Sequence, residues 1–178
     1  MRSRLSVRRR IFELVLFAML GAVMFCSKLI TEALPNIHLL GMFTMLYTLL
    51  FRAKALIPIY VFVFLTGLYA GFSPWWIPYL YLWLILWAVT MLLPRKLPKR
   101  GARILYPAVC SLFGLAYGTL YAPAQALMYH IGWEGMLAWI AAGFSFDLLH
   151  AAGNLFAGLL IHPLSVRMKK LLDRTQPS

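Results

Sequence analysis

Carboxylates, a lysine, an imidazole and an amide lie inside long apolar runs of this sequence, where polar groups are rare. Asp147, His150 and Asn154 follow one another at i, i+3 and i+7, so they would share one face of a helix. Lys28 and Glu32, spaced i and i+4, would share a face near the end of the first run. A charge inside a membrane span is costly unless it meets a partner or a cavity, so each group is a candidate for function.

Each of these polar groups also has a purely structural interpretation. Lys28 can pair with Glu32 or with Asp147, or can extend its ammonium group to the outer headgroups, instead of contacting a ligand. Asp147, expected near the midplane of its span, can join an interhelical hydrogen-bond network. His150 and Asn154 are expected deeper than Asp147 and therefore fit the structural role better. These alternatives stay open at the level of the sequence.

Aromatic and amide side chains extend the candidate site. Tyr79 and Trp83 would lie on one face of a tryptophan-rich span and offer a flat wall to a heterocyclic ligand, although they can equally pack within the protein. Pro123 removes a backbone hydrogen bond from an apolar helix, and Gln125 beside it carries an amide that needs partners in lipid. The predicted substrate-binding residues are Lys28, Glu32, Asn36, His38, Tyr79, Trp83, Tyr121, Gln125, Asp147 and His150.

The composition places these residues in a membrane protein. The 178-residue chain is 62% hydrophobic and 12% charged, and apolar runs of about 18 residues or more recur along it, which argues against disorder and against an ordinary soluble domain. We expect one all-α integral membrane domain over residues 1–178, a bundle of six transmembrane helices at about 11–33, 39–51, 55–72, 75–93, 104–131 and 135–161. The second span is short for a hydrocarbon layer of about 30 Å, so the loop before it could dip into the membrane.

The positive charges predict the topology. The chain carries 17 Lys and Arg residues against 5 Asp and Glu, a net charge of +12. With the N-terminus in the cytoplasm, all of the basic residues except Lys28 lie on cytoplasmic segments. Because each basic cluster lies at the end of an apolar run, the charge indicates membrane orientation and not nucleic-acid binding. We therefore expect a multi-pass membrane protein with both termini in the cytoplasm.

Several sequence motifs of enzymes and metalloproteins are missing. There is no GxxxxGK[ST] motif for binding ATP phosphates, no HExxH or GxSxG motif and no other evident set of nucleophile and base. Cys26 and Cys110 have neither CxxC spacing nor a histidine spacing suited to a metal. We therefore predict no enzymatic activity, no cofactor and no metal for this chain.

Small residues on the first apolar run favour close contact with another helix. Ala18, Gly21 and Ala22 fall on one helical face, and Ala18 and Ala22 have the small-xxx-small spacing typical of helix association in lipid. Three further segments are similar to segments of a known protein family: SKLITEALPNIHLLGMF, LYAPAQAL and FDLLHAAGNLFAGLL. With these features, six expected spans and a short second span, the whole chain resembles the substrate-binding S component of energy-coupling factor (ECF) transporters.

The resemblance implies a location in a prokaryotic cell (plasma) membrane and a function. It implies high-affinity capture of a vitamin or related small heterocycle from outside, in the outer half of the bundle, with the first loop as a lid and spans four to six supplying most contacts. Ala18, Gly21 and Ala22 would dock on a separate transmembrane coupling subunit that two cytosolic ATPases drive. The ligand's identity, and whether the coupling module is shared, stay open. The alternative is a small homo-oligomeric channel or an intramembrane enzyme that uses Asp147 and His150.

Overall fold

The computed structural model describes residues 2–33 and 37–175, with the side chains of residues 7, 8, 10–33 and 37–174. Every element in these residues is helical and no strand occurs among them, which confirms the all-α prediction. The α-helices are α1 (Arg2–Thr31), α2 (Leu40–Phe51), α3 (Leu56–Ala70), α4 (Tyr79–Leu92), α5 (Lys99–Leu115), α6 (Tyr117–Tyr129), α7 (Gly132–Gly158) and α8 (Ile161–Thr175). Two 3₁₀ turns, η1 (Arg52–Ala55) and η2 (Pro74–Trp76), come before α3 and α4.

Long apolar helices are compatible with a multi-pass membrane protein. Within the described residues, five stretches are long and apolar enough to cross a membrane: Arg10–Thr31, Leu40–Ala70, Pro74–Leu92, Lys99–Tyr129 and Gly132–Gly158. The second stretch contains both α2 and α3. Since α2 has 12 residues, or about 18 Å of helix, it is too short to cross a hydrocarbon layer of about 30 Å alone.

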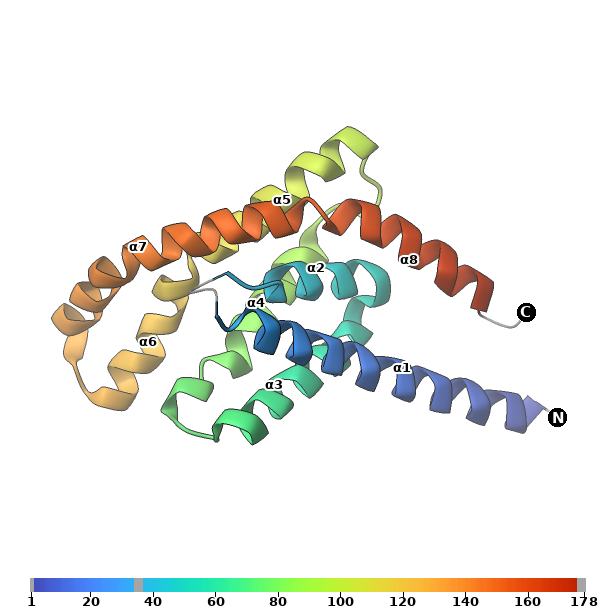
Figure 1. The fold of residues 1–178 in the computed structure, drawn as a ribbon, viewed down its shortest axis with the longest axis horizontal. Coiled ribbons are helices and arrows are strands. Elements are labelled where there is room, and N and C mark those ends of the chain that lie inside the picture. The colour runs from blue at the N-terminus through green and yellow to red at the C-terminus, as the bar shows by residue number, and fades with distance from the viewer. Residues whose placement is uncertain (1, 34–36, 176–178) are drawn as a thin grey trace.

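Interactions of Arg52 fix the turn between α2 and α3. Arg52 ends α2 with a φ of 55°, and Figure 1 shows α3 running back toward the side from which α2 comes. The Arg52 guanidinium donates through Nη2 to the Met91 carbonyl at 2.8 Å, and the Trp87 indole donates to the Arg52 carbonyl at 3.1 Å. The turn is therefore attached to the last part of α4.

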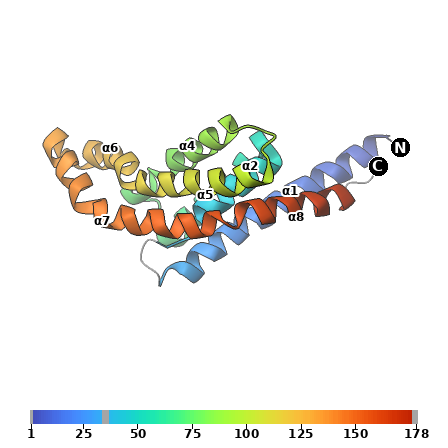
Figure 2. The ribbon, with the colours of Figure 1, turned by 90° about the horizontal axis from the view of Figure 1, so that it is seen from above.

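Close backbone contact positions α7 on α5 and α6, and Figures 1 and 2 show α7 lying along both helices. A Cβ atom at Gly114 would lie 2.8 Å from the His150 carbonyl oxygen, and one at Gly118 would collide with the Asp147 carboxylate. The GxxxG spacing of these two glycines therefore serves contact within the chain, where small residues let helices approach closely.

Large aromatic side chains form the core around α2. Trp83, Tyr47 and Phe62 are the largest fully buried side chains, and they come from α4, α2 and α3. Most of α2 is buried, because it packs on α4, α5, α7 and α8. The segment that leads into α2 therefore enters a space enclosed by longer helices.

The start of α1 and the end of α8 lie at the same end of the molecule in both Figure 1 and Figure 2. The prediction that both termini lie on one side of the membrane requires such a placement. That this side is the cytoplasm stays a prediction.

Candidate functional site

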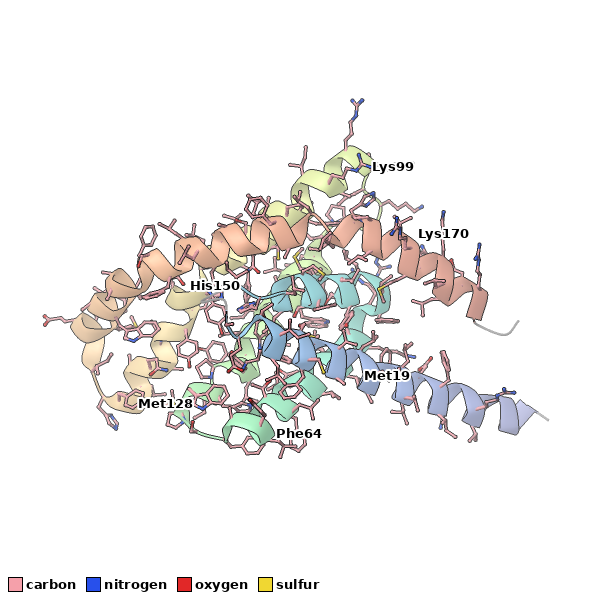
Figure 3. The ribbon with its side chains drawn as sticks, viewed as in Figure 1. Met19, Phe64, Lys99, Met128, His150 and Lys170 are labelled. Atoms are coloured by element: carbon pink, nitrogen blue, oxygen red, sulfur yellow. The ribbon has the colours of Figure 1, made fainter. Side chains whose placement is uncertain are left out.

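Two histidines from distant parts of the chain meet inside the bundle. His38 lies in the segment before α2, and His150 lies 18 residues after the first residue of α7, about 27 Å along that helix. Their Nε2 atoms are 2.7 Å apart, and their ring centroids are 4.6 Å apart. Figure 3 labels His150 in the middle of the molecule, beside the segment that leads into α2. This segment therefore reaches among the helices, where protein covers its backbone.

The hydrogen bond between the two rings requires complementary protonation. One Nε2 must carry a hydrogen and the other must offer a lone pair, so the two imidazoles have different tautomers or one is charged. Within the described residues, no third His, Cys, Asp or Glu side chain joins this pair in a group that could hold a metal ion. The pair is thus a hydrogen-bonded link between the segment before α2 and the middle of α7.

Aromatic rings surround the histidine pair. The Tyr117 ring lies 4.7 Å from the His150 ring and 6.4 Å from the His38 ring. The Trp83 ring lies 6.3 Å from the His38 ring and 6.3 Å from the Tyr117 ring. The two imidazoles therefore sit against a wall built from α4 and the start of α6.

Two more tyrosines continue this wall. The Tyr79 ring meets the Trp83 ring at 5.7 Å, and the Tyr121 ring stacks on the Tyr117 ring at 6.0 Å. The structure thus brings five of the predicted residues into one connected set of rings: His38, Tyr79, Trp83, Tyr121 and His150.

Two buried polar atoms at this site have no hydrogen-bond partner among the described residues, Trp83 Nε1 and His38 Nδ1. Asn154 Oδ1, one helical turn beyond His150, is likewise without a partner there. The indole N–H can only donate, whereas His38 Nδ1 donates or accepts according to its tautomer. An unpaired buried polar group costs about 1–3 kcal/mol, and each such group in a native structure calls for an explanation. These atoms are therefore the positions at which a polar ligand atom would be most stabilised.

Asp147 is bound to the backbone of a neighbouring helix. The N–H of Gly118, the second residue of α6, donates to Asp147 Oδ1 at 2.9 Å. α6 follows Ala116, whose side chain has no acceptor for the free N–H groups at a helix start. A carboxylate from α7 thus caps α6, and its charge is favourable at the positive end of that helix. Asp147 therefore makes an interhelical hydrogen bond, which is the structural role that the sequence left open. A contact between Asp147 and a ligand stays a prediction.

Tyr117 is the central ring that was not among the predicted residues. It begins α6 directly after the break at Ala116 that separates α5 from α6. The sequence indicated an interruption at Pro123, but α6 continues through Pro123 to Tyr129. One signal was available, since Tyr117 and Tyr121 are spaced i and i+4 and therefore share a helical face.

Lys28 lies near the histidine pair, whereas Glu32 is exposed. Of the described residues, neither Glu32 nor Asp147 forms an ion pair with Lys28. Burial, together with the neighbouring His150 and the Lys28 charge, lowers the pKa of His38 to about 3. The cause is that an imidazolium would lie away from water beside other basic groups. His38 is therefore neutral at physiological pH.

Tyr121 is attached to the turn before α4, and Gln125 contacts Tyr121. The Tyr121 hydroxyl donates to the Trp75 carbonyl at 2.7 Å, and the Gln125 side chain interacts with the same hydroxyl. This contact supplies the partner that an amide in lipid needs. The remaining predicted site residue, Asn36, lies outside the described residues.

The small residues of α1 lie on two different surfaces. A Cβ atom at Gly21 would lie 2.5 Å from a Val61 side-chain carbon, so Gly21 allows α3 to approach α1 within the chain. Ala18 is exposed, and Ala22 lines a shallow apolar groove on α1. The other residues that line this groove are Met19, Val23, Cys26, Ser27 and Ile30. Met19, labelled on α1 in Figure 3, is 63% exposed, so the groove is open to another helix.

No family model, no curated protein and no solved structure matches this chain.

Proposed function

We propose that this chain is a membrane-embedded binding protein for a small, flat heterocycle and that it works as the S component of an ECF-type importer. The observation that carries the proposal is the buried Trp83 indole N–H, which has no described partner and lies among aromatic rings around the His38–His150 pair. Sites for small molecules combine apolar and aromatic walls with a few polar groups that fix orientation. This combination inside a helical bundle supports solute binding over a purely structural core.

The groups of the site would have separate roles in binding. Trp83 and Tyr117 would contact the ligand ring, and such aromatic pairs contribute about 0.5–1.5 kcal/mol each beyond the burial of area. Trp83 Nε1 would donate to a ligand acceptor, and His38 Nδ1 would donate or accept according to its tautomer. Lys28, whose charge reaches His38, would favour a ligand that carries a negative substituent.

Import would need partner subunits. The sequence has no phosphate-binding motif for ATP, so two cytosolic ATPases would supply the energy through a transmembrane coupling subunit. The apolar groove beside Ala22 would receive a helix of that subunit, because small side chains let helices approach closely in lipid. Ala18, exposed one turn earlier, would extend the same contact.

The test is mass spectrometry of small molecules that co-purify with the detergent-solubilised chain and with two tryptophan variants. Trp83→Phe keeps a large ring and removes the unpartnered N–H. Trp133→Phe is the matched control, since Trp133 lies at the start of α7 and is 69% exposed. We expect a stoichiometric heterocycle with the wild type and with Trp133→Phe. Trp83→Phe should retain less of it, because the Kd should rise about tenfold or more, the effect of about 1.4 kcal/mol. No bound heterocycle, and no thermal stabilisation by any member of a vitamin panel, would contradict the proposal.

The enzyme alternative has less support from the geometry. Asp147 accepts a hydrogen bond from the Gly118 N–H, and His150 contacts His38. Asp147 and His150 therefore each have a partner elsewhere in the protein. His150→Ala would abolish turnover if this pair were catalytic, whereas a binding protein would retain weaker ligand binding. A homo-oligomeric channel would instead show a defined multiple of the chain mass in detergent and ion conductance in vesicles.

A further inference from the structure

One face of α8 (Ile161–Thr175) is fixed against the bundle. Ile161 is fully buried, and Leu164 and Met168 pack against the core formed with α2 and α5. These residues recur at i, i+3 and i+7, which defines a single helical face. The orientation of α8 about its own axis is therefore set by packing.

A stripe of three basic residues lies on the other side of α8. Arg167, Lys170 and Arg174 recur at i, i+3 and i+7, and Lys170 lies about 180° around the helix from Ile161 at 3.6 residues per turn. All three are exposed, and within the described residues none of them is in an ion pair. Figure 3 shows Lys170 pointing away from the bundle. We call these three residues the α8 stripe.

Exposed apolar residues border the α8 stripe. Leu171, between Lys170 and Arg174, is 58% exposed, and Leu159 and Leu160 before α8 are also exposed. The apolar stretch of α7 ends at Gly158, three residues before α8 begins. A basic face next to exposed leucines, directly after a stretch able to cross a membrane, is typical of helices that lie in the headgroup layer.

We propose that α8 is an interfacial helix whose stripe of Arg167, Lys170 and Arg174 binds the phosphate groups of anionic phospholipids. Guanidinium and ammonium groups both bind phosphate oxygens, and the adjoining leucines would contact the acyl chains. A lipid is favoured over an acidic protein surface because the charges adjoin apolar residues at the end of a membrane stretch. This proposal is independent of whether the chain binds a heterocycle.

Bound lipid would also stabilise the fold locally. α8 packs on α2 and α5, so a headgroup that holds the outer face of α8 favours the packed position of its inner face. Each basic residue near an anionic surface increases binding by about fivefold, and the effect weakens with salt because the charges are screened.

The experiment compares single charge removals on two faces of one helix. Lys170→Gln removes a charge from the α8 stripe, and Lys169→Gln removes an equal charge from a face about 100° away, on the side of Asp173. The full chain and each variant are placed in bilayers that mix phosphatidylglycerol with phosphatidylcholine, and the lipids retained after extraction are counted by native mass spectrometry. The triple variant Arg167→Gln, Lys170→Gln, Arg174→Gln completes the set.

We expect the wild type to retain phosphatidylglycerol in preference to phosphatidylcholine. Lys170→Gln should reduce that preference by about fivefold, Lys169→Gln should leave it nearly unchanged, and the triple variant should abolish it. Equal losses for Lys169→Gln and Lys170→Gln would show a diffuse effect of net charge and overturn the proposal. A wild type without preference would overturn it as well, as would stripe variants that keep the lipid preference but lose a co-purifying protein. If the triple variant does not fold, the two single variants still decide the question.

Discussion

Burial of His38, beside His150 and the Lys28 charge, lowers the pKa of this imidazole and should make the stability of the protein sensitive to acid. In the unfolded chain His38 binds a proton below about pH 6.5, whereas in the folded protein it does so only near pH 3. Between these values the unfolded state binds more protons, so the free energy of unfolding falls as the pH falls, by at most about 1.4 kcal/mol per pH unit. We expect the thermal midpoint of the purified protein to decrease from about pH 7 to about pH 5.

A variant of each of two histidines tests the origin of this pH dependence. His38→Gln should lower the stability at neutral pH and flatten its dependence on pH, because the titrating group is removed. His162→Gln, a change in α8 away from the pair, should keep the wild-type slope. An unchanged slope in His38→Gln would assign the acid sensitivity to other groups.

Gly118 is a position at which one added methyl group should be destabilising. A Cβ atom there would collide with the Asp147 carboxylate, so Gly118→Ala must displace either α7 or the side chain that caps α6. We expect a loss of about 1–3 kcal/mol, as for overpacked sites. Gly143→Ala is the matched control in α7, since a Cβ atom there meets nothing within 4 Å.

The two glycine variants should differ in stability, because only Gly118→Ala is expected to be destabilising. Alanine is preferred to glycine in a helix by about 0.5–1 kcal/mol, so Gly143→Ala should be neutral or slightly stabilising. Unfolding of both variants in mixed micelles gives the comparison. Similar stabilities for both would mean that α7 does not press on α6 at Gly118.

At the scale of whole elements, the start of α6 depends on a side chain from α7. Asp147→Ala removes the acceptor of the Gly118 N–H and should cost about 0.5–2 kcal/mol, as for the loss of a helix cap. Asp147→Asn keeps an oxygen acceptor and loses only the favourable charge at the helix start, a loss of about 0.3–1 kcal/mol. The expected order of stability is wild type, then Asn, then Ala.

Hydrogen exchange at the first turn of α6 locates this effect. Protection of the Gly118 amide should drop in Asp147→Ala and drop less in Asp147→Asn, because local opening exposes the N–H groups of the helix start. Amides near the middle of α3 serve as an internal reference. Equal protection at Gly118 in all three proteins would rule out the cap.

The helices were largely predictable, because long apolar runs can be recognised in the sequence without knowledge of the tertiary structure. The break at Ala116 was not, since neither glycine nor proline lies at that position, and its stabilising partner is Asp147, 31 residues later. The proximity of His38 to His150 was equally hidden, because it joins residues 112 positions apart. Local sequence therefore showed which residues are unusual, while the partners that define their roles depend on tertiary packing.

At the scale of the whole molecule, the basic residues and the placement of the chain ends together predict one topology. Lys99 and Lys170, in α5 and α8, lie away from His150 in Figure 3. Ser73 comes directly before η2 and α4, and Glu134 lies in the first turn of α7. With basic segments in the cytoplasm, Ser73→Cys and Glu134→Cys should react with a membrane-impermeant thiol reagent in intact cells. Lys99→Cys and Lys170→Cys should react only after the cells are opened.

Two background changes make this labelling experiment interpretable. Cys26 and Cys110 are replaced by alanine first, because Cys26 is exposed on α1 and would add its own signal. Labelling of Lys170→Cys in intact cells would mean that α8 lies outside the cell and that the topology is the inverse of the predicted one. Labelling of Ser73→Cys alone, with Glu134→Cys protected, would mean that α7 begins inside the cell and that the number of crossings before it is even.

The expected pattern requires that the chain cross the membrane an odd number of times between Ser73 and Lys99, and again between Lys99 and Glu134. The stretch Pro74–Leu92 would make the first crossing and the stretch Lys99–Tyr129 the second, so the labelling tests each stretch separately.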